Sequence, residues 1–240
     1  VDDIRLTGMA HMVFVRSPYG HANIKSIDTS AAASAPGVIT VFTGADLQEE
    51  LGGLPVGWLL PDLKQPPHPP LAFETVRYVG DAVAAVVADT AYQAADAAEL
   101  VDVDYEVLPA IVNAEDAVQD GAVQLHPEAE NNIAWDWNIG GGDYDEAIKD
   151  PDVIVVKERI INQRLIPNSM ETRGVVADFD SGRGNLTLYT STQIPHLVRL
   201  LYSLVTGSSE QKVRVVAPDV GGGFGSKISI YAEEVVSGII

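Results

Sequence analysis

The sequence predicts a mixed α+β (mixed α/β) fold, and three observations support this. The 240 residues are 46% hydrophobic and 20% charged, a composition typical of globular proteins. In the first half, short strand-like runs, which are rich in β-branched residues or alternate between apolar and polar residues, are interspersed with Ala-rich stretches typical of helices. After residue 151, a hairpin pattern leads into an amphipathic helix and a further strand.

The first elements are short strands separated by turn residues. The patterns predict strands at residues 9–15, 24–28 and 38–43. A short Ala-rich helix begins at Asp28-Thr29-Ser30 and ends at Pro36-Gly37. Residues 46–51 form at most one helical turn. Residues 51–70 contain six prolines and predict a loop long enough to have a function or to contact a partner.

The next stretch predicts a strand, a helix and a second strand. Residues 82–88 are continuously apolar, as expected of a strand buried on both faces. Thr90 caps a helix over residues 91–100, and a strand follows at 101–105. Asp102 and Asp104 alternate with apolar residues in that strand. A solvent-exposed strand face therefore explains them better than a pair of catalytic carboxylates does.

The last elements surround a predicted hairpin. Residues 108–142 are irregular, 143–149 predict a short helix, and 152–166 show the pattern of a long strand. Strands at 174–179 and 186–190 flank a glycine-containing hairpin loop. Pro195 begins an amphipathic helix that ends at Gly207, and a short strand follows at 213–216. We expect one face of this helix to consist of leucines, namely Leu197, Leu200, Leu201 and Leu204.

Charge and cysteine content exclude several classes of protein. The net charge is −19, and residues 1–150 hold 25 acidic and 6 basic side chains, whereas 151–240 hold nine of each. This imbalance indicates a boundary within residues 110–150, and it disfavours binding to nucleic acids or anionic membranes. The sequence contains no cysteine, which excludes disulfides, zinc ribbons and Cys-held iron–sulfur clusters in this chain. No apolar run reaches the roughly 18 residues of a membrane span.

Familiar hydrolytic and metal motifs are also missing. None of the five histidines lies in a zinc-type spacing, and no serine lies in a Gly-x-Ser-x-Gly context. Both ends of the sequence suggest a fragment of a longer protein, because it starts at Val1 and stops inside an apolar run.

A glycine-rich stretch is the first candidate binding element. Gly221-Gly222-Gly223-Phe224-Gly225-Ser226-Lys227 follows the strand at 213–216, and we expect a helix from about residue 229. Closely spaced glycines let backbone N–H groups approach an anion or a cofactor. The nucleotide motifs do not fit, because Ser226 stands where a dinucleotide fingerprint needs glycine. A flexible loop is the alternative, but Phe224 favours a shaped binding loop.

A second candidate lies at the end of the strand at 186–190. Gln193 follows that strand and precedes the helix that begins at Pro195, a position where α/β proteins often place their sites. On the alternative interpretation, Thr192 is a helix cap and Gln193 is an ordinary exposed amide. One helix and one strand separate the two candidates, which could bring both to the same end of a sheet.

These segments resemble a known family. Thr192-Gln193-Ile194-Pro195-His196 and residues 220–227 look like the two N-terminal cofactor segments of the molybdenum hydroxylase large subunit, the family of xanthine dehydrogenase, aldehyde oxidase and carbon-monoxide dehydrogenase. Residues 168–177 are similar to the family's Pro-Met-Glu-Pro-Arg segment, with Ser169 and Thr172 in place of the prolines. The N-terminal α/β hammerhead domain of the family is matched by residues 16–22, 35–38 and 78–88.

The resemblance implies a domain division and a cofactor. Residues 1–110 would form the hammerhead domain, 111–150 a linker, and 151–240 the truncated start of the cofactor-binding domain. The cofactor would be a molybdenum–pyranopterin, either plain or as its cytosine dinucleotide. Gln193 would hydrogen-bond near the oxo ligand of the metal, and no residue of this chain would ligate the metal directly. The backbone lining the metal and pterin would come from Gly222, Gly223, Phe224 and Gly225.

The resemblance also implies a reaction and partners. The whole protein would oxidise a small molecule, namely an aldehyde or an N-heterocycle with oxygen taken from water, or carbon monoxide. Iron–sulfur clusters and FAD would reside on a small and a medium partner subunit, in a cytoplasmic dimer of heterotrimers without nucleic-acid or membrane partners. Ile228 stands where xanthine dehydrogenases carry an acidic residue, which favours an aldehyde-oxidase-like or CO-dehydrogenase-like branch.

The general-base glutamate of the family, and the cysteine loop of CO dehydrogenases, would lie further along the chain. We therefore expect no catalytic residue within these 240 residues, and no activity of this stretch alone. Two alternatives remain at the level of the sequence. One is a non-catalytic scaffold fragment that keeps the fold without the metal. The other is a nucleotide- or phosphate-binding α/β domain that uses residues 221–225.

Overall fold

The computed structural model describes residues 1–240 and contains three three-stranded sheets. The first sheet has the order β1-β5-β3, and both of its strand pairs are antiparallel. Its strands are β1 (His11–Arg16), β5 (Ala82–Ala88) and β3 (Val38–Thr43). All seven residues of the central β5 are buried, as its unbroken run of alanine and valine predicts.

Short helices cover this sheet. Helix α3 (Ala91–Ala98) packs against β1 and β5, and the Thr90 side chain caps it by accepting a hydrogen bond from Gln93 N–H. Two single-turn helices lie beside β3, namely α1 (Ser30–Ala33) and α2 (Gly44–Leu47). None of the helices in residues 1–240 is long and apolar enough to cross a lipid bilayer.

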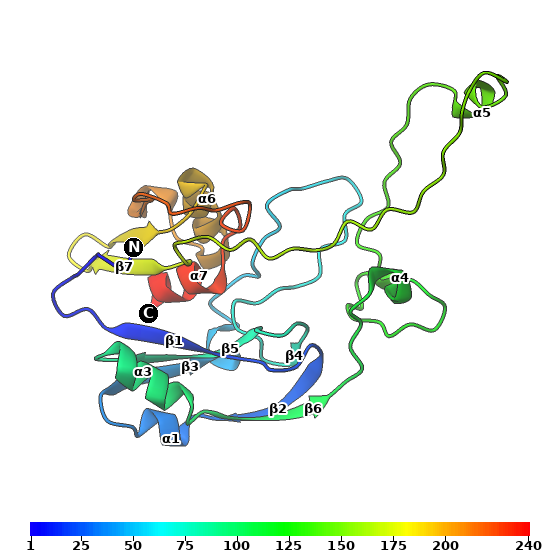
Figure 1. The fold of residues 1–240 in the computed structure, drawn as a ribbon. Coiled ribbons are helices and arrows are strands. Elements are labelled where there is room, and N and C mark those ends of the chain that lie inside the picture. Colours follow the sequence, from blue (N-terminus) through cyan, green and yellow to red (C-terminus); the bar gives the residue numbers. More distant parts are fainter.

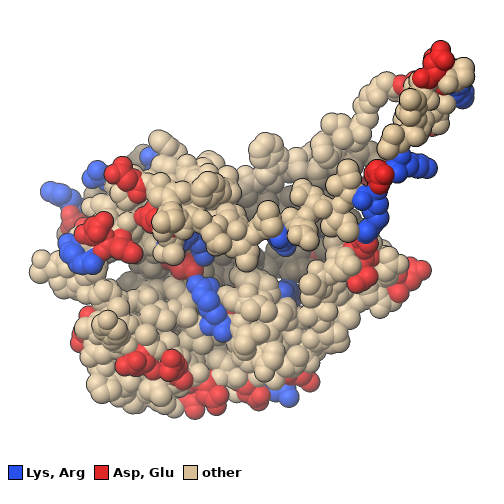
Figure 2. All heavy atoms as spheres, viewed as in Figure 1, with Lys and Arg blue, Asp and Glu red and all other residues tan.

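The second sheet has the order β4-β2-β6 and is antiparallel throughout. Its strands are β4 (Thr75–Val76), β2 (Ala22–Asp28) and β6 (Asp102–Val107). Asp102 and Asp104 are exposed while Val103 and Tyr105 are half-buried, so the predicted alternation is confirmed. Acidic side chains gather along the lower edge of the molecule in Figure 2, where Figure 1 places β2, β6, α1 and α3.

The third sheet has the order β7-β8-β9. Strands β7 (Val175–Asp180) and β8 (Asn185–Thr190) form the predicted antiparallel hairpin. Strand β9 (Val213–Val216) lies parallel to β8, and helix α6 (Pro195–Thr206) makes the crossover between them. Because parallel strands end at the same edge of a sheet, the segments that follow β8 and β9 emerge together.

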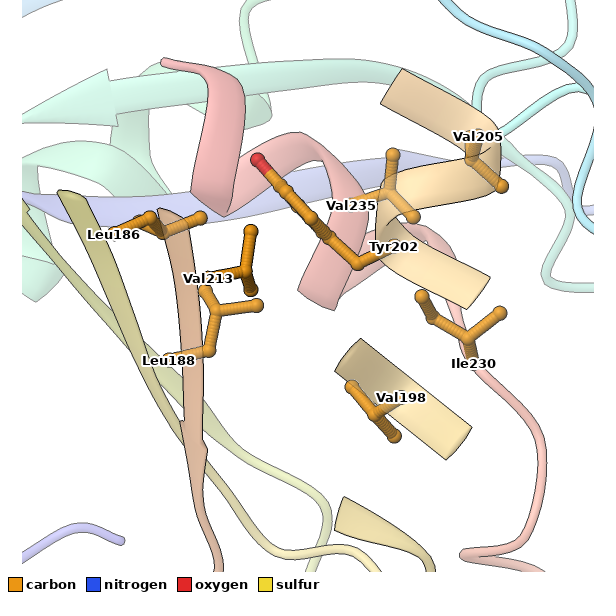
Figure 3. Packing of buried hydrophobic residues seen from close by; sticks show 8 residues of the cluster. All are labelled: Leu186, Leu188, Val198, Tyr202, Val205, Val213, Ile230 and Val235. Atoms are coloured by element: carbon orange, nitrogen blue, oxygen red, sulfur yellow. The ribbon is translucent and has the colours of Figure 1, made fainter. Parts of the chain in front are cut away.

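The core of this second half lies between the β7-β8-β9 sheet and two helices (Figure 3). Helix α6 contributes Val198, Tyr202 and Val205, all of them buried. The predicted leucine face is not the face that packs on the core, since Leu197, Leu200 and Leu204 are exposed. Both stripes have helical spacing, and the sheet and α7 pack on the stripe that contains Tyr202. The cluster as a whole contains Leu186, Leu188, Val198, Tyr202, Val205, Val213, Ile230 and Val235.

Helix α7 (Ala232–Ile239) lies between the first and third sheets (Figure 1). Its Val235 belongs to the core beside β8, whereas its Val236 packs with Leu71 and Ala85 of the first half. Arg16 at the end of β1 forms an ion pair with Glu233 of α7. The helix begins at Ala232, three residues later than the predicted start near residue 229.

An extended arm connects the two halves of the chain (Figure 1). It contains the short helices α4 (Ala114–Ala117), η1 (Glu130–Asn132) and α5 (Tyr144–Ala147). The long strand predicted at residues 152–166 is wrong, because this stretch contains no strand. Ile154 and Ile160 are 89% and 87% exposed, and no neighbouring strand provides hydrogen-bonding partners. The predicted fold class, mixed α+β, is confirmed by the arrangement of the remaining elements.

Candidate functional site

The segment that contains Gln193 and the glycine-rich loop meet at the carboxyl edge of the third sheet. Gly225 N–H and Lys227 N–H both donate to Gln193 Oε1, at 3.0 and 3.4 Å. In return, Gln193 N–H donates to the Lys227 carbonyl at 2.9 Å. The prediction that the two candidate loops lie at one end of a sheet is therefore confirmed.

These contacts fix the orientation of the Gln193 carboxamide. Its oxygen, Oε1, accepts hydrogen bonds from two backbone N–H groups. The amide nitrogen cannot take that position, because it would then face two hydrogen-bond donors, so Nε2 points away from the loop backbone. The Gln193 side chain is exposed, and Nε2 makes no hydrogen bond to the protein. The site thus presents a neutral NH₂ donor whose direction is set by the loop backbone.

The glycine-rich loop adds further donors from the main chain. Its backbone has positive φ at Gly222 (99°), Phe224 (50°) and Gly225 (87°). Where right-handed and left-handed backbone conformations alternate in this way, successive N–H groups point toward the same side of the chain. The N–H groups of Gly223 and Phe224 have no acceptor in the protein. The Phe224 ring is 73% exposed beside them. The loop therefore offers two consecutive main-chain donors next to an aromatic surface.

Two glycines are required here by close approach. A Cβ at Gly223 would lie 2.3 Å from Gln193 Oε1, and one at Gly221 would lie 2.6 Å from Glu171 Cβ. Any larger residue at either position would push the loop away from its neighbour. Close packing against Gln193 explains the glycine at 223, and close packing against Glu171 explains the glycine at 221.

Sequence reasoning missed a buried polar cluster beneath the loop. Lys227 Nζ donates to Ser191 Oγ at 2.7 Å and to the Glu171 carbonyl at 2.9 Å. Glu171 Oε2 accepts from Ser191 Oγ–H at 2.7 Å and from Gly221 N–H at 2.8 Å. These hydrogen bonds, first from Gly221 and then from Ser191, lower the pKa of Glu171 to about 2.

The sequence contains only a weak signal for this buried cluster of Glu171, Ser191 and Lys227. Glu171 lies within the segment that resembles the Pro-Met-Glu-Pro-Arg pattern, and Lys227 ends the glycine-rich stretch. A lysine beside glycines in a loop is ordinarily exposed, so nothing in the sequence distinguishes a buried one.

A second buried carboxyl lies at the start of α7. Glu234 accepts hydrogen bonds from Thr190 Oγ1–H at 3.0 Å and from Tyr231 N–H at 2.9 Å. Burial raises the pKa of Glu234 above its ordinary value. Four residues separate Lys227 from α7 (Ala232–Ile239), so the helix begins later than the expected start near residue 229, and Glu234 occupies its first turn.

Comparisons with known proteins match both halves of the chain. Residues 1–109 match the family model described as "Aldehyde oxidase and xanthine dehydrogenase, a/b hammerhead domain", and residues 125–240 match the "Molybdopterin cofactor-binding domain". The carbon monoxide dehydrogenase large chain of Hydrogenophaga pseudoflava is 38% identical over 96% of this chain and 30% of its own length. The nicotine 6-hydroxylase large subunit of Paenarthrobacter nicotinovorans is 37% identical over 98% of this chain and 29% of its own.

Solved structures agree with the sequence comparisons. The quinoline 2-oxidoreductase from Pseudomonas putida 86 superimposes with a TM-score of 0.86 at 34% identity, covering 99% of this chain and 30% of that one. A reconstituted CO dehydrogenase from Oligotropha carboxidovorans gives a TM-score of 0.86 at 38% identity, covering 100% and 31%. The chain therefore belongs to the molybdenum hydroxylase large-subunit family, and it spans about 30% of the length of the relatives that it matches.

Proposed function

We propose that this chain is the N-terminal part of the molybdopterin-binding large subunit of a molybdenum hydroxylase. In this proposal residues 1–110 form the hammerhead domain, 111–150 a linker, and 151–240 the start of the cofactor-binding domain. The residues that contact the molybdenum–pyranopterin cofactor are Gln193, Gly222, Gly223, Phe224 and Gly225. The observation that carries the proposal is the set of unpartnered N–H donors at Gln193 Nε2, Gly223 and Phe224, on two segments that are hydrogen-bonded to each other.

The chemistry of these donors fits such a cofactor. Oxo and phosphate oxygens are hydrogen-bond acceptors, and three neutral donors can contact them without placing a further charge at the site. The structure contains no group of three or more His, Cys, Asp or Glu side chains that could hold a metal ion. In this proposal, contacts from this chain reach the oxygen atoms around the metal, and the pterin holds the metal itself.

In this function the residues of the chain bind and orient. When bound, the cofactor supplies the two-electron redox chemistry that oxidises the substrate with oxygen from water. Gln193 Nε2 would donate to an oxygen beside the metal, in a direction that the Gly225 and Lys227 N–H groups fix through Oε1. The Gly223 and Phe224 N–H groups would hold a second acceptor, and the exposed Phe224 ring would shield it from water on one side.

The substrate proposed is an aldehyde, an N-heterocycle or carbon monoxide. The position after Lys227 is Ile228, a partly exposed apolar residue that provides no carboxylate for hydrogen bonds to a purine. Relatives of this chain include a CO dehydrogenase large chain and a nicotine 6-hydroxylase large subunit. The general-base glutamate of the reaction would come from another part of the protein.

Partners follow from the same proposal. The chain has no cysteine, so iron–sulfur clusters that carry the electrons away would belong elsewhere, on a small subunit beside a medium subunit with FAD. We include the dimer of heterotrimers, the cytosine dinucleotide form of the pterin and a cytoplasmic location in the proposal, on the strength of the family resemblance.

Metal analysis of the purified protein tests the proposal directly. We expect about one molybdenum per copy of the chain, together with an extractable pterin. A protein without molybdenum and pterin would contradict the proposal and favour a scaffold that keeps the fold alone. Tight binding of ATP or NAD by such a protein would instead favour a nucleotide-binding domain.

The variant Gln193→Ala tests the role of the carboxamide. A hydrogen bond to a charged acceptor contributes about 1.5–3 kcal/mol, which corresponds to a loss of turnover of about 10- to 150-fold per bound molybdenum. Gln211→Ala is the matched control, because Gln211 is an exposed glutamine whose side chain makes no hydrogen bond. Wild-type turnover in Gln193→Ala would refute the role assigned to this residue.

A further inference from the structure

Both ends of the glycine-rich loop, residues 221–227, are attached to one residue. At the first end, Gly221 N–H donates to Glu171 Oε2 at 2.8 Å, and the Gly221 carbonyl accepts from Glu171 N–H at 3.1 Å. At the last end, Lys227 Nζ donates to the Glu171 carbonyl at 2.9 Å and lies 3.4 Å from Oε2. Glu171 therefore holds the first and the last residue of the loop close together.

The attachment at Lys227 is buried and complete. The Lys227 side chain is 1% exposed, and its three N–H donors have three acceptors, namely Ser191 Oγ, the Glu171 carbonyl and Glu171 Oε2. An ammonium group buried in this way is costly unless charge and hydrogen bonds compensate it. Of the two carboxylate oxygens of Glu171, only Oε2 contacts the loop.

The main chain of Lys227 extends the same attachment to Gln193. Its N–H donates to Gln193 Oε1, and its carbonyl accepts from Gln193 N–H and from Thr192 Oγ1–H, the latter at 3.2 Å. Displacing Lys227 would therefore release the orientation of the carboxamide as well as the end of the loop.

We propose that Glu171 and Lys227 are positioning residues that pre-organise the donors of Gln193, Gly223 and Phe224 before the cofactor enters. This inference rests on the proposed function and adds two residues to it. Neither side chain hydrogen-bonds to these donors, so both act through the loop. The ion pair fixes the ends of the loop, and the N–H groups of Gly223 and Phe224 between them have no acceptor in the protein. Pre-organisation lowers the cost of ordering the loop when a ligand binds.

The test compares Glu171→Gln and Lys227→Met with wild type in the intact protein. Glu171→Gln keeps the shape of the side chain and removes its charge, so the buried ammonium loses its counter-ion. We expect the hydrogen-bonded amides of the loop, those of Gly221, Gly225 and Lys227, to exchange with deuterium about tenfold faster or more, because a local opening costs less when an anchoring contact is lost. We also expect molybdenum content to fall. In the remaining loaded protein, kcat per molybdenum should fall, while KM stays within about threefold because neither residue contacts substrate.

Matched controls come from exposed charges of the same half. Glu210→Gln removes a surface ion pair with Arg199, and Lys212→Met removes an exposed contact with the Arg183 carbonyl at 2.8 Å. Both should leave exchange and molybdenum content unchanged, since exposed pairs contribute little. The double variant Glu171→Gln/Lys227→Met should be less impaired than the sum of the single variants, because it leaves no buried charge without a partner.

The outcomes separate the inference from the proposed function. If Glu171→Gln retains wild-type exchange and molybdenum content, the inference is overturned, although the proposed function stands. If the wild-type protein contains no molybdenum, the proposed function fails. The deuterium-exchange rates of the loop then decide by themselves whether Glu171 and Lys227 fix its conformation. If Lys227→Met does not fold, Glu171→Gln still provides the decision.

Discussion

The substitution Gly223→Ala tests the contact between the glycine-rich loop and Gln193. Gly223 has no positive φ, so alanine suits its backbone, and only the added Cβ matters. That Cβ would lie 2.3 Å from Gln193 Oε1 and 2.5 Å from Cδ. The Gln193 side chain must therefore swing away and lose its hydrogen bonds from Gly225 N–H and Lys227 N–H. At about 1 kcal/mol per neutral hydrogen bond, the loss of stability should be about 1–2 kcal/mol.

A double-mutant cycle isolates this contact. In the Gln193→Ala background the atoms that clash with the new Cβ are gone, so Gly223→Ala should then cost less than about 0.5 kcal/mol. Urea unfolding of the four proteins, followed by circular dichroism, measures the free energies and their coupling. Gly140→Ala is the control, because Gly140 lies in open space without positive φ.

The coupling decides the outcome of the cycle. A cost of Gly223→Ala that is equal in both backgrounds would refute the close-approach argument. The same variant should lose molybdenum while Gly140→Ala retains it, since displacing the carboxamide removes one of the proposed donors.

Two further substitutions test the electrostatics and the core, and a third, at an exposed leucine, serves as a control. Burial raises the pKa of Glu234 in the folded protein, so its charged form is penalised at neutral pH and the penalty is relieved as the pH falls through the raised value. Wild type should therefore gain stability relative to Glu234→Gln when the pH is lowered from 7 toward 5, and a pH-independent difference in urea midpoint would contradict this. Leu188→Ala removes a fully buried side chain from the core in Figure 3 and should cost about 2–5 kcal/mol. Leu204→Ala, at a residue 66% exposed, should change stability by no more than about 0.5 kcal/mol.

Much of the fold and part of the site could be predicted because the signals are local. The Ala/Val run of β5 is apolar at every position, a pattern typical of a short strand that is buried on both faces. The Thr90 cap and Gly207, with φ 70° at the end of α6, mark helix ends through short-range geometry. Gln193 and the glycine-rich loop could be paired because a single helix crossover makes their strands parallel.

The remaining features depend on contacts that are distant in the sequence. Residues 152–166 have the composition of a strand, but a strand forms only where another backbone pairs with it. The stripes of α6 that contain Leu204 and Tyr202 both have helical spacing, and only the position of the sheet and α7 selects between them. Lys227 is buried because Glu171, 56 residues earlier, provides a carbonyl and a carboxylate.

The position of α7 makes the site depend on both halves of the chain. The glycine-rich loop leads within a few residues into this helix, whose Val235 packs in the core beside β8 and whose Val236 packs against Ala85 of β5. The helix cannot shift with respect to either sheet without opening one of these clusters, because close-packed side chains resist small displacements. Glu171 fixes the loop from one side and α7 limits its movement from the other. A substitution that loosens the β1-β5-β3 sheet should therefore affect the donors of Gln193 and Gly223 through α7, although no residue of that sheet hydrogen-bonds to them.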